Sequence, residues 1–78
     1  MAAQTIRAIL NEAAARLAHL ASSRRDAELL LQRALGCDRA WLLTHGDERI
    51  TEAQRHKFDA WLTRRSRHEP VQYIVGEQ

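Results

Sequence analysis

The sequence predicts an all-α protein, folded as a compact five-helix bundle with short connections. Apolar residues make up 45 % of the 78 residues, and aromatic residues only 5 %. Leucine and alanine supply much of the apolar share, and this composition favours packed helices over a sheet. Apolar side chains also recur at helical spacing, and the segments between helices are short enough to join antiparallel neighbours. A chain of this length supports one small domain.

The first helix begins after Thr5, whose hydroxyl suits the N-cap position, and residues 1–4 are expected to be a loose N-terminus. The apolar face of this helix comprises Ile6, Ile9, Leu10, Ala13, Leu17 and Leu20. In the second helix, Ser23 and Asp26 have the spacing of a capping box, and Gly36 is expected to end the helix. Its predicted core residues are Ala27, Leu30, Leu31, Ala34 and Leu35.

The third helix is short. Asp38 is expected to cap it, and the helix runs through His45 until Gly46 closes it. Thr51 and Gln54 have the spacing of another capping box, which starts the fourth helix. The core side of the fourth helix presents Phe58, Trp61 and Leu62.

A fifth helix over residues 70–75 is predicted from its two ends. Pro70 has a fixed φ and no amide proton, so it suits the first helical position, and Gly76 would close the helix in a left-handed conformation. The chain ends two residues later. We therefore expect residues 5–76 to be one domain of a longer protein and residues 77–78 to begin a linker.

Catalytic, cofactor-binding and metal-binding residues are not predicted in this chain. The carboxylates are scattered, and no spacing would bring a pair of them into one cleft. None of the four histidines stands three or four residues from another, and there is one cysteine, Cys37. The three glycines all fall at predicted helix ends, so they supply no phosphate-binding loop.

Charge and hydropathy predict a cytoplasmic protein without a membrane partner. Twelve Lys and Arg residues and ten Asp and Glu residues give a formal net charge of +2, which is an ordinary solvated surface. Apart from alanine stretches, the longest apolar run is residues 40–43, far shorter than a membrane span. A single cysteine excludes an internal disulfide and fits a reducing compartment.

The best candidate for a partner-docking surface is a basic strip on the fourth helix, formed by Lys57, Arg64 and Arg67. These residues share one helical face, with only the small side chains of Ala53 and Ala60 between them. A solvated surface without a partner explains the same pattern equally well.

Two residues depart from the expected apolar faces. Leu29 lies off the apolar face of the second helix, between two arginines. It either docks a partner or is buried because the second helix is central, and we favour burial. Arg65 continues the apolar face of the fourth helix, where we expect it to pair with Asp26 or Glu69 or to stack on an aromatic ring.

Three segments carry a further signal. Residues 64–76 read Arg-Arg-x-x-x-Glu-Pro-x-x-Tyr-Ile-x-Gly, residues 23–31 read Ser-Arg-Arg-Asp-Ala-Glu-Leu-Leu-Leu, and Leu-Gly at 35–36 precedes Arg-Ala-Trp-Leu at 39–42. In this order and spacing they resemble the N-terminal domain of the release-factor glutamine methyltransferases, the HemK/PrmC family. The resemblance covers nearly the whole chain. One departure is His68, where the family usually has glycine, and it leaves open how the fourth helix ends.

The resemblance implies a substrate-docking domain at the N-terminus of an S-adenosylmethionine-dependent enzyme. That parent would methylate the glutamine of the Gly-Gly-Gln motif in class I peptide chain release factors. Its partners would be those release factors and its own catalytic domain. The Asn-Pro-Pro-Tyr motif of such enzymes does not occur in this sequence, so the segment alone is not expected to be catalytic. Pro70, Tyr73 and Gly76 are the matched positions expected at the interdomain joint.

An alternative from another class is a small helix-turn-helix-like DNA-binding domain. Residues 35–38, which lead to Leu42 and Gly46, resemble the turn of that motif. A recognition helix needs a polar outer face, whereas residues 39–45 contain three large apolar residues in a row. We therefore expect this helix to be buried on at least two sides and nucleic acid to be an unlikely partner, in keeping with the low net charge.

Overall fold

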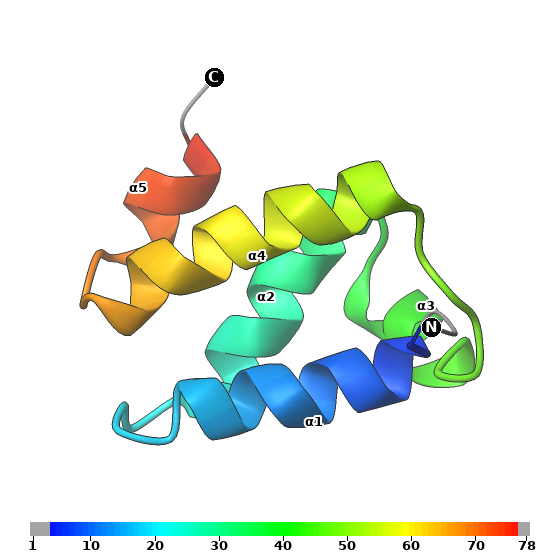
Figure 1. The fold of residues 1–78 in the computed structure, drawn as a ribbon, viewed down its shortest axis with the longest axis horizontal. Coiled ribbons are helices and arrows are strands. Elements are labelled where there is room, and N and C mark those ends of the chain that lie inside the picture. The colour runs from blue at the N-terminus through cyan, green and yellow to red at the C-terminus, as the bar shows by residue number, and fades with distance from the viewer. Residues whose placement is uncertain (1–3, 77–78) are drawn as a thin grey trace.

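A computed structural model describes residues 4–76 and confirms the all-α class. Its helices are α1 (Ile6–Arg16), α2 (Ser23–Leu35), α3 (Arg39–Thr44), α4 (Glu52–Ser66) and α5 (Val71–Gly76). In Figure 1, α2 crosses between α1 and α4, while α3 lies near the start of α1 and α5 beside the end of α4. Helix α2 contacts each of the other four helices, so it is the centre of the bundle.

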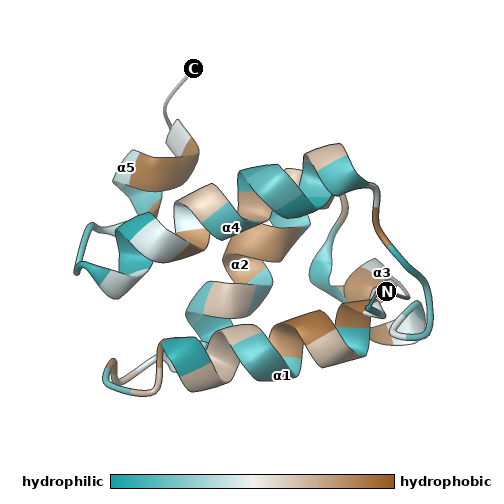
Figure 2. Ribbon diagram, viewed as in Figure 1, coloured by the Kyte–Doolittle hydropathy of each residue, from teal (hydrophilic) through white to brown (hydrophobic). Residues whose placement is uncertain are grey.

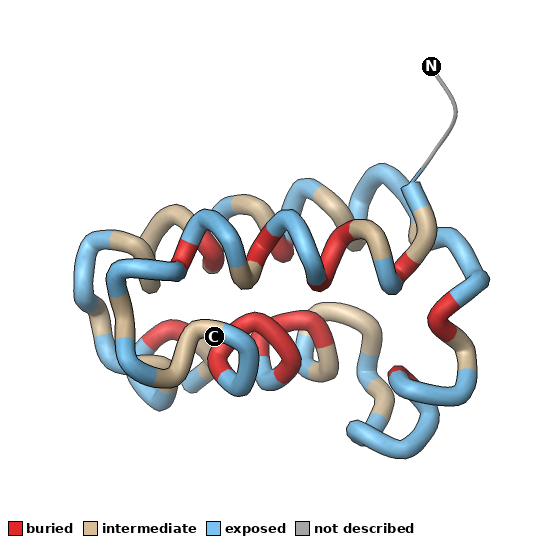
Figure 3. The backbone as a smooth tube through the Cα atoms, turned by 90° about the horizontal axis from the view of Figure 1, so that it is seen from below, coloured by how far each residue is buried: buried red, intermediate tan, exposed pale blue. Residues whose placement is uncertain are grey.

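The core fills the space between these helices and follows the predicted faces closely. Figure 2 shows the hydrophobic segments of the helices, and Figure 3 shows that buried residues lie on their facing sides. The buried apolar residues are Ile6, Ile9, Leu10, Ala13, Leu17, Ala27, Leu30, Leu31, Leu42, Phe58, Leu62 and Ile74. Of the predicted core residues, four are only partly buried: Leu20, Ala34, Leu35 and Trp61.

The start of α1 shows why its cap was recognisable from sequence. The first N–H groups of a helix have no partner within the helix. As predicted, Thr5 is the N-cap, and its hydroxyl accepts a hydrogen bond from the N–H of Ala8 at 3.2 Å. The N–H of Ile6 donates to the carbonyl oxygen of Glu48 at 2.8 Å. The loop that follows α3 therefore holds the N-terminus of α1.

The end of α3 lies one residue earlier than predicted, and Gly46 does not close the helix in a left-handed conformation. The helix ends at Thr44, with His45 as its C-cap at φ −111°. Gly46 is buried, and its carbonyl oxygen accepts the N–H of Arg7 at 3.0 Å. Its role is thus to bring the chain back against α1, an arrangement that local sequence does not encode.

The capping box predicted at Ser23 is also wrong. Helix α2 begins at Ser23, its N-cap is Ser22, and no side chain caps it. The hydroxyl of Ser22 instead donates to the Asp26 carboxylate at 3.1 Å, and Arg65 donates to the same oxygen at 3.0 Å. The acid is therefore used for a tertiary contact. At the other end of α2, Gly36 is left-handed at φ 71°, as predicted.

The predicted caps of α3 and α4 are confirmed. Asp38 accepts a hydrogen bond from the N–H of Trp41 at 2.8 Å. Thr51 and Gln54 form the full capping box, with reciprocal side-chain to backbone hydrogen bonds of 3.1 and 2.9 Å. These contacts satisfy N–H groups that would otherwise lack partners at the helix starts.

Helix α5 starts one residue later than predicted. Pro70 precedes it, and its carbonyl oxygen accepts the N–H groups of Tyr73 and Ile74 at 3.1 and 3.3 Å. Ile74 is completely buried and closes the end of the bundle. The prediction of a left-handed Gly76 is wrong, because this glycine is the last helical residue and lacks a positive φ.

The predicted loose N-terminus and linker fall almost entirely outside the part of the chain that the structure describes. Residues 1–3 of the expected loose N-terminus and residues 77–78 of the expected linker lie outside the described residues. Gln4 itself has two side-chain partners, since it donates to Glu12 at 3.0 Å and accepts from Arg55 at 2.7 Å.

Two predictions of burial are wrong. Leu29 is 37 % exposed although α2 is the central helix. In α3, Leu42 is buried, but Trp41 and Leu43 are 38 % and 49 % exposed. Helix α3 is therefore buried on one side only. Its exposed apolar side chains still disfavour a recognition helix, which needs a polar outer face.

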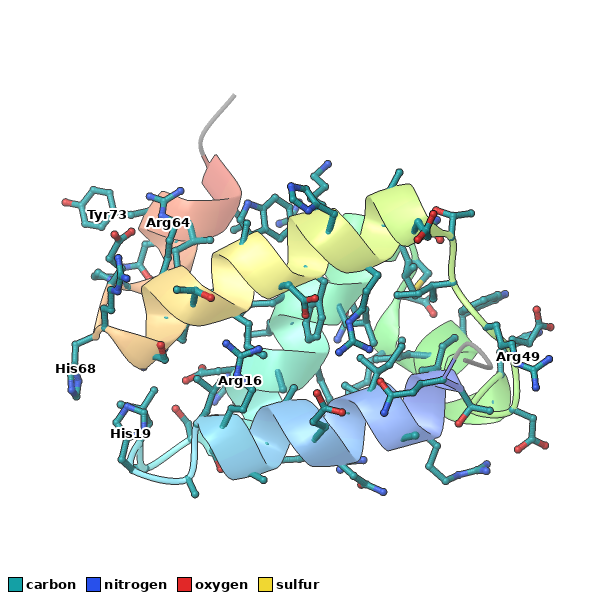
Figure 4. All side chains as sticks on the ribbon, viewed as in Figure 1. Arg16, His19, Arg49, Arg64, His68 and Tyr73 are labelled. Atoms are coloured by element: carbon teal, nitrogen blue, oxygen red, sulfur yellow. The ribbon has the colours of Figure 1, made fainter. Side chains whose placement is uncertain are left out.

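His68 answers how α4 ends. The helix stops at Ser66, and His68 takes the left-handed position at φ 71°. Its ring meets that of His19 edge to face, with the centroids 5.3 Å apart, and Figure 4 shows the two rings at the same end of the molecule. His19 Nε2 donates to the carbonyl oxygen of Ser66 at 3.0 Å. A residue with a Cβ thus ends α4 in a conformation that favours glycine.

We therefore expect His68→Gly to stabilise the chain by about 0.5–1 kcal/mol, because it relieves the left-handed strain at a small loss of ring contact. Gly36→Ala is the matched reverse change at the other left-handed helix end, where an added Cβ would meet nothing within 4 Å. Gly36→Ala should lower the free energy of unfolding by about 1 kcal/mol, because alanine is strained at a positive φ even where no atom is in its way. Urea midpoints measure both effects, and a lower midpoint for His68→Gly would contradict the expectation.

Candidate docking surfaces

In the basic strip predicted on α4, two of the three cations contact other side chains. Lys57 Nζ lies 5.1 Å from the centroid of the Trp61 ring, within the range of a cation–π contact. Arg64 Nε donates to the carboxylate of Glu69 at 2.7 Å. Arg67 is exposed at the C-cap of α4. Arg67 makes no ion pair or ring contact with the other described residues.

The three residues expected at an interdomain joint lie together at α5. Pro70, Tyr73 and Gly76 are all exposed, and Tyr73, at 68 %, is the most exposed of the large hydrophobic side chains of the described part. Figure 4 shows the Tyr73 ring extending away from the bundle, at the same end as Arg64. An exposed, amphipathic tyrosine suits a contact with another protein surface.

Arg65 positions α5 against the bundle. Its Nε donates to the Asp26 carboxylate at 3.0 Å, and its other nitrogen donates to the backbone oxygen of Glu69 at 3.0 Å. Only 18 % of the Arg65 side chain is exposed, which confirms the predicted pairing at the core edge. One guanidinium thereby joins α2, α4 and the turn into α5, so the direction of α5 depends on it.

Glu28 is a second buried acid, and sequence reasoning missed it. Its carboxylate accepts from Arg39 at 2.9 Å and from Arg24 at 3.3 Å, while the residue is 7 % exposed. Burial raises the pKa of Glu28, but the hydrogen bonds and charges of Arg39 and Arg24 outweigh it, so the pKa lies below its ordinary value. The i,i+4 spacing from Arg24 was the available signal.

Residues 4–76 contain no group of three His, Cys, Asp or Glu side chains that could hold a metal ion. Cys37 is half-buried, and burial together with the charge of Asp38 raises the pKa of its thiol, which disfavours the reactive thiolate. None of the described helices is long and apolar enough to cross a membrane.

Comparison with known proteins agrees with the motifs. The family described as the PrmC N-terminal domain matches residues 8–76. Proteins named release factor glutamine methyltransferase are 49 % identical over 55 residues in Xylella fastidiosa (strain Temecula1), 40 % over 67 residues in Escherichia coli (strain K12) and 42 % over 69 residues in Yersinia pestis. These alignments cover 70 %, 86 % and 88 % of this chain.

The alignments cover only 20 %, 24 % and 25 % of the respective relatives, so the chain spans a quarter of their length or less. The comparison with solved structures found no match to this chain. The family match extends over almost all of the described residues, in the helical arrangement set out above. The chain therefore belongs to the PrmC N-terminal domain family.

Proposed function

We propose that this chain is the substrate-docking domain of a longer, cytoplasmic methyltransferase that acts on class I peptide chain release factors. The parent would transfer a methyl group from S-adenosylmethionine to the glutamine of the Gly-Gly-Gln motif, as a protein-(glutamine-N5) methyltransferase. The observation that carries this proposal is the family match over residues 8–76, together with relatives named release factor glutamine methyltransferase. In this proposal the chain docks the substrate and leaves chemistry and cofactor binding to the catalytic domain.

Docking is the role that a small helical domain suits in such an enzyme. The substrate is a folded protein, and specific recognition of a folded protein needs roughly 800 Å² from each partner, far beyond one glutamine side chain. Contacts remote from the reacting group can hold that group in position for the transition state. The bundle offers a charged surface for this purpose, with 12 Lys and Arg and 10 Asp and Glu among its 78 residues.

The proposed contacts are the basic strip of Lys57, Arg64 and Arg67 for the substrate, and the residues at α5 for the catalytic domain. The strip would steer an acidic surface of the release factor, with Arg67 as its most available charge. Pro70, Tyr73 and Gly76 would form the interdomain joint, whose direction is supported by the hydrogen bond from Arg65 to the backbone of Glu69.

Deleting residues 1–78 from the full-length enzyme tests the docking role. We expect kcat/KM for an intact release factor to fall by roughly 100-fold, because productive positioning of the glutamine would be lost. For a short Gly-Gly-Gln peptide, which is too small to reach the docking domain, the loss should be within about threefold. Initial rates of methyl transfer, measured with both substrates and both enzyme lengths, give the comparison.

Charge reversal at Lys57, Arg64 and Arg67 should reproduce part of the loss on the intact release factor, mostly as slower association. An equal loss on peptide and protein after the deletion would contradict docking. It would show instead that these residues stabilise the catalytic domain.

A further inference from the structure

The strongest feature that the proposed function leaves unexplained is the exposed surface of α2 around Leu29. Arg25, Leu29 and Arg33 follow one another at intervals of four residues, so they lie along one line on the helix. Leu29 is 37 % exposed on the helix that contacts all the others. We call this surface, together with the part of α5 beside it, the Leu29 face.

The Leu29 face is hollowed on three sides of the leucine. Depressions of about 570, 360 and 260 Å³ all share Leu29 in their walls. The smallest is the most apolar in its lining, where Val71 and Val75 of α5 join the leucine. Exposed apolar surface with a concave shape, rimmed by polar groups, is typical of protein interaction sites. The face can therefore receive an apolar side chain beside Leu29.

The rim of this face is positively charged. Arg25 and Arg33 have no ion-pair partner among residues 4–76. Arg24 and Arg39 also line the largest depression, and the acid between them, Glu28, is buried and bonded to both. At this depression, two arginines therefore share one buried carboxylate, which leaves a net positive charge.

The second acid at this face is already neutralised. Asp26 lines the middle depression, but it is 6 % exposed and paired with Arg65 at 3.0 Å. Five arginines and two carboxylates line the three depressions, which leaves an excess of three positive charges around Leu29. An anionic partner is the complement of this arrangement.

We propose that the Leu29 face binds an acidic helix of the protein substrate, with one large apolar side chain seated against Leu29. Eight residues of helix separate Arg25 from Arg33, a rise of about 12 Å. A complementary helix would place carboxylates about two turns apart and a leucine, methionine or phenylalanine between them. This inference rests on the proposed function, because it takes the partner to be the protein that the enzyme methylates.

The test uses the full-length enzyme with two variants of the Leu29 face. Arg25→Glu with Arg33→Glu reverses the unpaired charges, and Leu29→Ala shortens the central side chain. The control for net charge is Arg7→Glu with Arg16→Glu, which makes the same change of net charge on α1. Arg7 pairs with Asp47 at 2.6 Å and Arg16 donates to Thr63 at 3.3 Å, so the melting temperature of this control is measured with those of the other variants. Neither control arginine lines any of the three depressions.

We expect the double reversal to lower kcat/KM for the intact release factor by about tenfold and Leu29→Ala to lower it by about threefold. The peptide substrate should be unaffected by either, and the control should change neither substrate by more than about twofold. Raising the salt concentration should lower kcat/KM of the parent enzyme for the intact release factor toward that of the double variant, because salt screens the unpaired charges. Unchanged melting temperatures would show that the variants fold.

Three outcomes overturn the proposal. If the double reversal changes the intact release factor no more than the control does, the face is not a docking surface. If peptide and protein lose rate equally, the face packs on the catalytic domain instead. In the third outcome, deletion of residues 1–78 lowers kcat/KM only for the intact release factor, while neither Leu29-face variant lowers it. Only this inference then fails, and the domain docks the substrate through another surface.

Discussion

Replacing Phe58 with alanine is expected to lower the free energy of unfolding by about 4 kcal/mol. Phe58 is 1 % exposed and belongs to the central cluster with the leucines of α2 and α4. Truncation would lose the transfer free energy of the ring and leave a cavity that the surrounding helices can only partly fill. A chain of this size has only a few kcal/mol of stability in total, so the variant should be largely unfolded at 37 °C. Urea titration followed by far-ultraviolet circular dichroism measures the loss.

Trp61 provides the comparison. Sequence periodicity predicts that Trp61 and Phe58 are both core residues, whereas in the structure only Phe58 is fully buried. Trp61 is only half-buried, and Lys57 covers part of its ring. We expect Trp61→Ala to cost about 1–2 kcal/mol, since the side chain is only partly buried at the edge of the core. Equal urea midpoints for the two variants would contradict this and show that the Trp61 ring contributes as much to the core as the Phe58 ring does.

Replacing Arg65 with alanine is expected to cost about 3 kcal/mol, the second largest effect. The loss is large because the Asp26 carboxylate, 6 % exposed, would lose its cationic partner at a buried position. The hydrogen bond to the backbone of Glu69 would also disappear, so the turn into α5 should loosen. Hydrogen exchange at the amides of Tyr73 and Ile74 would report this loosening separately from global stability.

The double variant Asp26→Asn with Arg65→Met separates loss of the pair from loss of packing. Removing both charges should recover about half of the stability, because a buried pair costs less to replace than to break. Exposed Arg67→Ala is the matched control on the same helix and should lie within about 0.5 kcal/mol of the parent. If Arg65→Ala were as mild as Arg67→Ala, Asp26 would have to be solvated and the pairing unimportant.

Sequence alone was sufficient where the governing interactions are local. The hydroxyl of Thr5, the carboxylate of Asp38 and the pair Thr51 and Gln54 cap helices as predicted, because each contacts an N–H group three residues along the chain. The left-handed Gly36 is equally local, since its conformation depends on the missing Cβ. Apolar periodicity identified ten of the twelve buried apolar residues for the same reason. The motifs also identified the family, which the match over residues 8–76 confirms.

The tertiary structure decided the features that depend on distant partners. Asp26 has the local spacing of a capping residue, but the guanidinium of Arg65, 39 residues away, binds it more favourably than a helix start would. Gly46 and Leu29 depend on which surfaces pack against them, and periodicity within one helix cannot specify its neighbours. The exposed, arginine-rimmed Leu29 is therefore visible only in the assembled bundle, where α5 stops short of covering it.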